Sequence, residues 1–153
     1  MSARTTPRDY TIKDAAALTG LAASTLRYYE SVGVIAPISR GESSKHRVYD
    51  ENDLGQLLAI ACLAATGMSV NDMKEYVANG QLGAAAAAAQ IELLTERRQQ
   101  LALEARQIAL RQRYVELKID YWRAIDAGDE PRAALLAAEA SALADELKNA
   151  RRR

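Results

Sequence analysis

The longest stretch without glycine or proline lies between Gly83 and Gly128, and it constrains the fold more than any other feature. It allows one helix of about 45 residues, roughly 65 Å long at 1.5 Å per residue. Alanine is abundant, phenylalanine is absent and aromatic residues make up only 5% of the 153 residues. This composition favours tightly packed or long exposed helices over a bulky core. The sequence therefore predicts a mainly α protein.

Apolar residues recur every seven positions along this stretch, as in a coiled-coil interface. Two positions of the heptad carry them, and together they form what is called the seam below: Ile91, Leu94, Leu101, Ala105, Ile108, Val115, Ile119 and Trp122. Arg98 and Gln112 interrupt the seam, and polar residues at such positions often fix register and pairing orientation. We predict that residues 81–128 form a hinge and a long dimerisation helix.

A second apolar line on the same helix would remain exposed in a two-stranded coil. It consists of Leu103, Leu110 and Leu117, flanked by Tyr114 and Tyr121. The tail offers a cover, because Pro131 is suited to a helix start and leucines follow at helical spacing. We predict a helix within residues 129–153 that packs on the long helix of its own or a partner subunit, with a frayed end.

Two short helices joined by a tight turn are predicted near the N-terminus. The segment YTIKDAAALTG has Thr11 as a plausible N-cap and Gly20 as a stop. After residues 21–23, Ser24 is expected to cap a second helix that runs to about Ser31. Two short helices with a connection of this size predict a helix-turn-helix.

The next segment, IAPISRGESSKHRVYD, breaks the helical periodicity. Pro37 and Gly41 punctuate it, and β-branched residues flank a polar loop. We predict a small β-hairpin, or wing, in which residues 38–39 pair near residues 47–49. We also expect Gly41 to supply its turn.

Two more helices complete the predicted N-terminal domain, residues 9–80. Asp50 is expected to cap the first and Ser69 the second, which would end at residues 79–80. The inward positions predicted for the first of these helices are Leu54, Leu57, Leu58, Ala61 and Ala65.

A helix-turn-helix with a wing is suited to gripping duplex DNA, the second helix entering the major groove. Arg27 can donate to a phosphate or a guanine edge, and the hydroxyls of Tyr28 and Tyr29 can donate to the DNA backbone. Wing residues add positive charge: Arg40, Lys45 and Arg47. Alternatively, one of the two tyrosines belongs to the core and Arg27 is solvated.

Charge alone does not predict this partner. Residues 1–79 carry 8 Lys and Arg against 9 Asp and Glu, and the whole chain has a formal net charge of zero. The prediction therefore depends on where basic residues cluster.

Three segments, YTIKDAAALTGLAASTLRYYESVGVI, RVYDENDL and LAATGMSVNDMKEYV, resemble the MerR family of bacterial transcription regulators. The resemblance implies a winged helix-turn-helix, a hinge and a homodimer through an antiparallel coiled coil. It also implies that the dimer bends and untwists an overlong promoter spacer so that RNA polymerase holoenzyme can engage it. The positions that contact DNA in the family correspond to Ser24, Thr25, Arg27, Tyr28, Tyr29, Arg47 and Tyr49. One departure is Lys45, which stands where the family commonly has glycine.

LAIACLAATGM resembles the short branch of the family that is tied to aldehyde, electrophile and nitrosative stress. By that resemblance Cys62 is the candidate sensor, a thiolate that would add to an electrophile or be oxidised. The alternative is a purely structural cysteine, because small thiols fill helical cores well and no basic residue lies within a helical turn. The effector would then be a small apolar ligand bound near the alanine-rich segment, or there would be none.

Other classes of protein fit the sequence less well. One cysteine and one histidine cannot build a tetrahedral metal site, and no cofactor motif or nucleophile–histidine pair indicates an enzyme. A coiled-coil adaptor would explain residues 84–127 but not the capped helix-turn-helix and charged wing. No apolar run reaches the roughly 20 residues that span a bilayer, and the first ten residues lack the apolar segment of a signal peptide. We therefore expect a cytoplasmic, nucleoid-associated protein.

Overall fold

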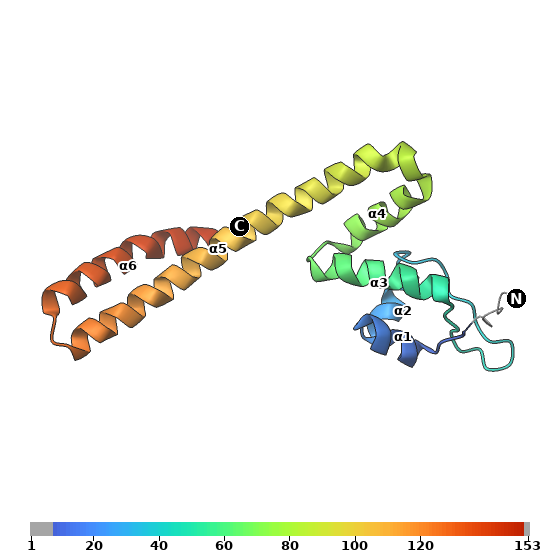
Figure 1. Ribbon diagram of the computed structural model, residues 1–153, viewed down its shortest axis with the longest axis horizontal. Coiled ribbons are helices and arrows are strands. Elements are labelled where there is room, and N and C mark those ends of the chain that lie inside the picture. Colours follow the sequence, from blue (N-terminus) through green and yellow to red (C-terminus); the bar gives the residue numbers. More distant parts are fainter. Residues whose placement is uncertain (1–7, 152–153) are drawn as a thin grey trace, which may run out of the picture. The chain divides into compact units, whose positions relative to one another are not determined.

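The computed structural model describes residues 8–151, and this part of the chain is predominantly helical, as predicted (Figure 1). The chain divides into two compact units, residues 1–97 and residues 98–153.

The first two helices of the N-terminal unit are α1 (Ile12–Thr19) and α2 (Ala23–Ser31). Thr11 caps α1 as predicted. Its side-chain oxygen accepts from the Asp14 N–H, and the Asp14 carboxylate accepts from the Thr11 N–H, which together form a capping box. Gly20 ends α1 in the left-handed conformation, with φ of 73°. The prediction that Ser24 caps α2 is wrong, because the N-cap is Ala22, which makes no side-chain bond.

Two further helices follow, α3 (Glu51–Ala65) and α4 (Val70–Leu82). Their predicted caps, Asp50 and Ser69, are confirmed, each accepting a bond from the backbone N–H three residues later. α4 continues through the predicted stop at Gly80, since a glycine in a helix interior weakens it without ending it.

The core of this unit is formed by residues from α1 to α4 and the segments between them. Leu26, Val34, Leu57, Ile60 and Met73 are almost completely buried. In α3 the inward face differs from the predicted one, because Leu58 is 46% exposed and Ile60 takes the buried position. The α3 sequence is apolar on nearly every side, so hydrophobic spacing alone does not determine which residues point inward.

The long helix α5 (Ala87–Asp126) follows a short 3-10 turn, η1 (Gly83–Ala86), and both lie within residues 81–128. Its first turns are attached to the end of α3, where the Arg97 Nε donates to the Thr66 carbonyl oxygen at 2.8 Å. Gly67 lies beside this contact: its φ of +80° favours glycine, and a Cβ there would lie 2.7 Å from Nη2 at the end of the Arg97 side chain.

In the second unit, α6 (Glu130–Arg151) runs back alongside the C-terminal part of α5 (Figure 1). The packed cluster joins Leu117 and Ala124 of α5 to three residues of α6, which are Ala133, Leu136 and Ala140. Arg113 and Glu139 add an ion pair at 2.8 Å across the same two helices. In this structure α6 thus packs on the long helix of its own chain.

The cover is shorter than the apolar line that it was predicted to hide. The cluster reaches from Tyr114 to Ala124 on α5, and Leu103 remains 56% exposed. The predicted fraying concerns residues 151–153: α6 includes Arg151, and positions 152–153 lie outside the described residues.

Candidate nucleic-acid interface

The helix α2 presents a polar and aromatic face to solvent. Leu26 and Tyr29, one turn apart, point into the core, and this leaves Ser24, Arg27 and Tyr28 on the outside. Thr25 is partly buried. The adjacent tyrosines therefore have different environments: Tyr28 is 50% exposed and Tyr29 only 7%, with their ring centroids 6.2 Å apart.

The predicted pairing of residues 38–39 near residues 47–49 is present as single hydrogen bonds and an isolated bridge, and not as regular strands. Within the wing (residues 38–49), Val48 N–H donates to the Ser39 carbonyl at 2.8 Å, and Arg40 bridges Arg47. Tyr49 pairs instead with Tyr10, outside the wing. The pairing partner of Tyr49 comes from a segment 39 residues earlier, which the local pattern of the wing does not encode.

The turn of the wing is made by an unexpected residue. Lys45 has a φ of 59°, the one non-glycine residue at positive φ in the described part of the chain. Gly41 does not adopt positive φ, but the turn over residues 42–44 begins directly after it. Lys45 N–H donates to the Gly41 carbonyl at 3.0 Å, and the Lys45 carbonyl accepts from Arg40 Nη1 at 3.1 Å. These bonds hold Lys45 in a conformation that costs an L-residue roughly 1 kcal/mol.

The base of the wing is attached to α2 through Glu30. One carboxylate oxygen of Glu30 accepts from the Arg47 Nε at 2.6 Å, and the other accepts from the Ile38 N–H at 3.2 Å. Burial of Glu30 raises its pKa, but the hydrogen bonds from Arg47 and Ile38 and the positive charge of Arg47 outweigh that effect and leave the pKa below its usual value. Glu30 was not among the predicted site residues, because its partners lie 8 and 17 positions away in the sequence.

Tyr49, a predicted DNA contact, lies in the core with no exposed surface. Its hydroxyl is buried without a hydrogen-bond partner in the structure. Burial raises the pKa of Tyr49. Tyr29 and Tyr49 are thus buried below the candidate interface, whereas Tyr28 lies on the surface of the protein.

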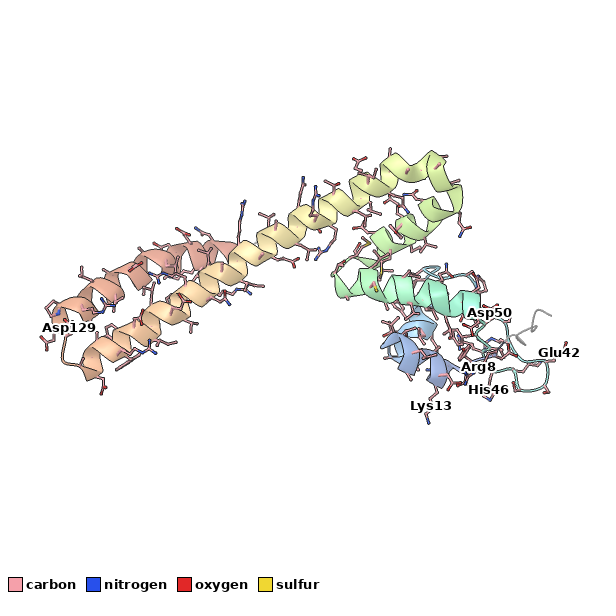
Figure 2. The ribbon with its side chains drawn as sticks, in the orientation of Figure 1. Arg8, Lys13, Glu42, His46, Asp50 and Asp129 are labelled. Carbon is pink, nitrogen blue, oxygen red and sulfur yellow. The ribbon has the colours of Figure 1, made fainter. Side chains whose placement is uncertain are left out.

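A groove of about 440 Å³ lies between the start of α1, α2 and the wing. Its basic lining residues are Lys13, Arg27, Arg40, His46 and Arg47. Figure 2 labels Lys13 and His46 at this end of the unit. Asp9 also lines the groove, so cationic groups outnumber carboxylates there. We call this the basic groove; it can bind anionic groups such as phosphates.

The basic groove brings together Arg27, Arg40 and Arg47 of the predicted contacts, and Lys45 lies on the adjoining exposed turn. Sequence reasoning missed Lys13. Its position directly after the capped start of α1 was the available signal, since the residues after an N-cap lie at a helix end that attracts anions.

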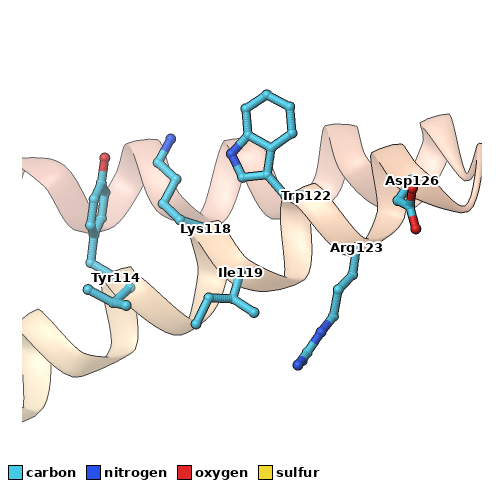
Figure 3. Close-up of a pocket in the computed structure, with 7 residues that line it drawn as sticks. Tyr114, Lys118, Ile119, Trp122, Arg123 and Asp126 are labelled. Carbon is cyan, nitrogen blue, oxygen red and sulfur yellow. The ribbon is translucent and has the colours of Figure 1, made fainter.

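Outside this surface, the seam is exposed along α5. Ile91, Ile108, Val115 and Trp122 are each more than half exposed, and Ala105 is exposed as well. Leu94, Leu101 and Ile119 are between 39% and 46% exposed. Near its C-terminal end the seam borders an open hollow of about 550 Å³ lined by α5 residues, and Figure 3 shows Ile119 and Trp122 projecting there.

Cys62 lies on α3 and is exposed, so it does not fill the core of this chain. Within residues 8–151, no cluster of three or more metal-ligating side chains is found. None of the helices described for this chain combines the length and apolar character needed to cross a membrane.

The segment that carries this surface is similar in sequence to known proteins. Residues 10–80 match the family model described as MerR HTH family regulatory protein. The regulator AdhR of Bacillus subtilis is 39% identical over 82 residues, which cover 54% of this chain and 58% of AdhR. The chain spans about half the length of the curated relatives it matches.

Solved structures extend the similarity beyond that region. A putative MerR family transcriptional regulator from Listeria monocytogenes is 31% identical with a TM-score of 0.62, covering 84% of this chain and 98% of that one. HiNmlR, described as a MerR family regulator lacking the sensor domain and bound to promoter DNA, is 25% identical with a TM-score of 0.62, covering 78% and 94%. These relatives are regulators and not enzymes, in keeping with the prediction. The chain belongs to the MerR family of helix-turn-helix transcriptional regulators.

Proposed function

We propose that the chain binds double-stranded promoter DNA through the basic groove and the exposed face of α2. The observation that carries this proposal is the convergence of Arg27, Arg40 and Arg47 on one groove beside a helix with exposed Tyr28. Arginine forks are suited to phosphate oxygens and guanine edges, and a helix of this size fits the major groove. The similarity to HiNmlR, which was crystallised on promoter DNA, supports the same partner.

We further propose that the active form is a homodimer joined through the seam in an antiparallel coiled coil. Eight apolar or small residues at heptad spacing are exposed on α5, and burying them against a second copy would remove that surface from water. The α6 helix occupies a different side of α5, so it leaves the seam free. A dimer would present two basic grooves to one DNA duplex.

Regulation would follow from deforming the DNA. Two DNA-binding units joined by a dimer can bend and untwist an overlong promoter spacer, bringing both promoter elements into reach of RNA polymerase holoenzyme. The exposure of Cys62 supports its candidacy as a sensor, because a small electrophile can reach the thiol. This activity belongs in the cytoplasm, at the nucleoid.

The test is footprinting on the promoter upstream of the coding gene, with and without an electrophile, for wild type and Cys62→Ser. Protection that weakens steeply with salt supports DNA binding. Hypersensitivity at the centre of the spacer, appearing only with an intact and treated thiol, supports the switch. If neither the electrophile nor the substitution changes the protection, Cys62 is not the sensor. The effector is then a small apolar ligand, or there is none. Absence of protection at every salt concentration would oppose binding to this promoter.

A further inference from the structure

We propose that Glu30 is a positioning residue for DNA binding: it fixes the orientation in which Arg47 presents its guanidinium to phosphate. This inference rests on the proposed function. Glu30 itself does not line the basic groove, whereas Arg47 does. Its action would therefore be exerted through Arg47.

The geometry around Glu30 joins three parts of the interface. Glu30 is in the last turn of α2, and its two carboxylate oxygens accept from the Ile38 N–H at the start of the wing and from the Arg47 Nε at its end. The Glu30 and Arg47 side chains are only 14% and 19% exposed. One carboxylate thus fixes both edges of the wing to the helix that would enter the major groove.

Arg47 has unused donors on its other side. A guanidinium carries five N–H groups in a rigid planar fork, and Glu30 engages the one on Nε. The two terminal nitrogens remain available to a phosphate while the Nε bond sets the plane of the fork. A free arginine would have to lose several rotamers on binding DNA, so Glu30 lowers that entropic cost in advance.

Simple electrostatics predicts the opposite effect. Removing a carboxylate beside a surface that binds a polyanion should strengthen binding, because it adds one net positive charge. If Glu30 positions Arg47, its removal should weaken binding to the specific promoter site despite the added charge. The two explanations therefore differ in sign.

The deciding experiment measures promoter and random-sequence affinity against salt concentration for the full chain and Glu30→Gln. Glutamine has the same size, and its amide oxygen can still accept from the Ile38 N–H. We expect promoter affinity to fall about tenfold and the slope of log K against log salt to decrease by about one, the loss of one phosphate contact. Random-sequence affinity should fall by a similar factor, because a contact to phosphate does not depend on the base sequence. Tighter promoter binding with an unchanged slope would overturn the proposal.

Glu42→Gln is the matched control. It removes the same charge from an exposed position in the wing loop, and it should leave the salt slope unchanged. Arg47→Gln is a second variant, which removes the guanidinium and leaves the carboxylate. It should lose the same slope, and adding Glu30→Gln to it should cost nothing further. If Glu30→Gln does not fold, a full slope in Arg47→Gln overturns the proposal. No salt-dependent binding by wild type would instead refute the proposed function itself.

Discussion

Tyr10 and Tyr49 exchange two backbone hydrogen bonds, of 2.8 and 2.9 Å, and so attach the segment before α1 to the end of the wing. The Tyr10 hydroxyl continues this attachment by donating to a Glu51 carboxylate oxygen at 2.8 Å. That hydrogen bond is the main reason why the pKa of Tyr10 is raised. As a result, the wing, the start of α1 and the start of α3 meet at one place, directly beside the basic groove.

The first prediction concerns the Tyr49 hydroxyl, which is buried without a partner. An unsatisfied buried polar group costs about 1–3 kcal/mol, so Tyr49→Phe should leave the free energy of unfolding unchanged or raise it by about 1 kcal/mol. If DNA binding exposes this hydroxyl to a phosphate, the same variant should weaken promoter binding several-fold. Urea unfolding and promoter titration measure the two effects separately.

Tyr28→Phe is the comparison for this prediction, because Tyr28 is half exposed. It should leave stability within about 0.5 kcal/mol of wild type, as most surface changes do. A clear loss of stability in Tyr49→Phe would mean that its hydroxyl has a partner in solution. Unchanged promoter affinity would remove Tyr49 from the set of DNA contacts.

The second prediction concerns strain at Lys45, whose φ is 59°. Glycine adopts this region freely, whereas a residue with a Cβ pays about 1 kcal/mol. Lys45→Gly should therefore be more stable than Lys45→Ala by about 1 kcal/mol in urea unfolding. Both variants lose the same positive charge, so they should weaken promoter binding alike. Equal stability of the two variants would show that Lys45 is not held at positive φ in solution.

Local features of this fold could be predicted from the sequence, since they depend on residues a few positions apart. The caps at Thr11, Asp50 and Ser69 each involve a bond to the third residue onward, and the sequence identifies them. The leucine spacing of the tail indicated a helix, but Leu136 packs on α5 between Ala133 and Ala140 while Leu135 is exposed. The cap at Ser24 failed because a suitable side chain does not by itself place the first turn of a helix.

The features that the sequence did not reveal are contacts between distant segments. The Glu30–Arg47 pair spans 17 residues, and nothing in the spacing of the residues between them marks it. The Tyr10–Tyr49 pairing spans 39 residues and adds to the pairing within the wing a contact that the local pattern does not encode. The sequence left open whether one tyrosine of the doublet Tyr28–Tyr29 belongs to the core. Helical geometry turns adjacent residues about 100° apart, and in the structure Tyr29 is the buried one.

The third prediction concerns pH. In the folded protein the pKa of Glu30 lies below its usual value of 4.5. The carboxylate therefore stabilises the fold above about pH 4.5, and this contribution is lost as the pH falls through the folded pKa. We expect wild type to be more stable than Glu30→Gln by about 1–2 kcal/mol at pH 7, the range for a charge-assisted bond that is largely buried.

Urea unfolding from pH 7 to pH 3 measures this difference for the two proteins. The gap should be constant near neutral pH and should shrink below pH 4.5, since protonation makes the wild-type side chain neutral as well. Glu42→Gln, with the carboxylate removed from the exposed loop, should follow wild type throughout. A gap that persists unchanged to pH 3 would mean that Glu30 stabilises the fold through packing and not through its charge.

The last prediction concerns the seam and compares two exposed aliphatic residues on different helices. Ile108 lies in the middle of the seam on α5 and is 51% exposed, whereas Leu135 lies on α6 and is 73% exposed. In a dimer through the seam, Ile108→Lys places a lysine from each copy in an apolar interface, and burying an unpaired charge costs several kcal/mol. Ile108→Lys should therefore be monomeric at micromolar concentration and bind the promoter at least about 100-fold more weakly, while Leu135→Lys stays dimeric with wild-type affinity. Analytical ultracentrifugation gives the mass of each variant, and circular dichroism confirms that its helices remain. Exposure alone would predict the larger effect at Leu135, so a dimeric Ile108→Lys or a monomeric Leu135→Lys would place the interface on another surface.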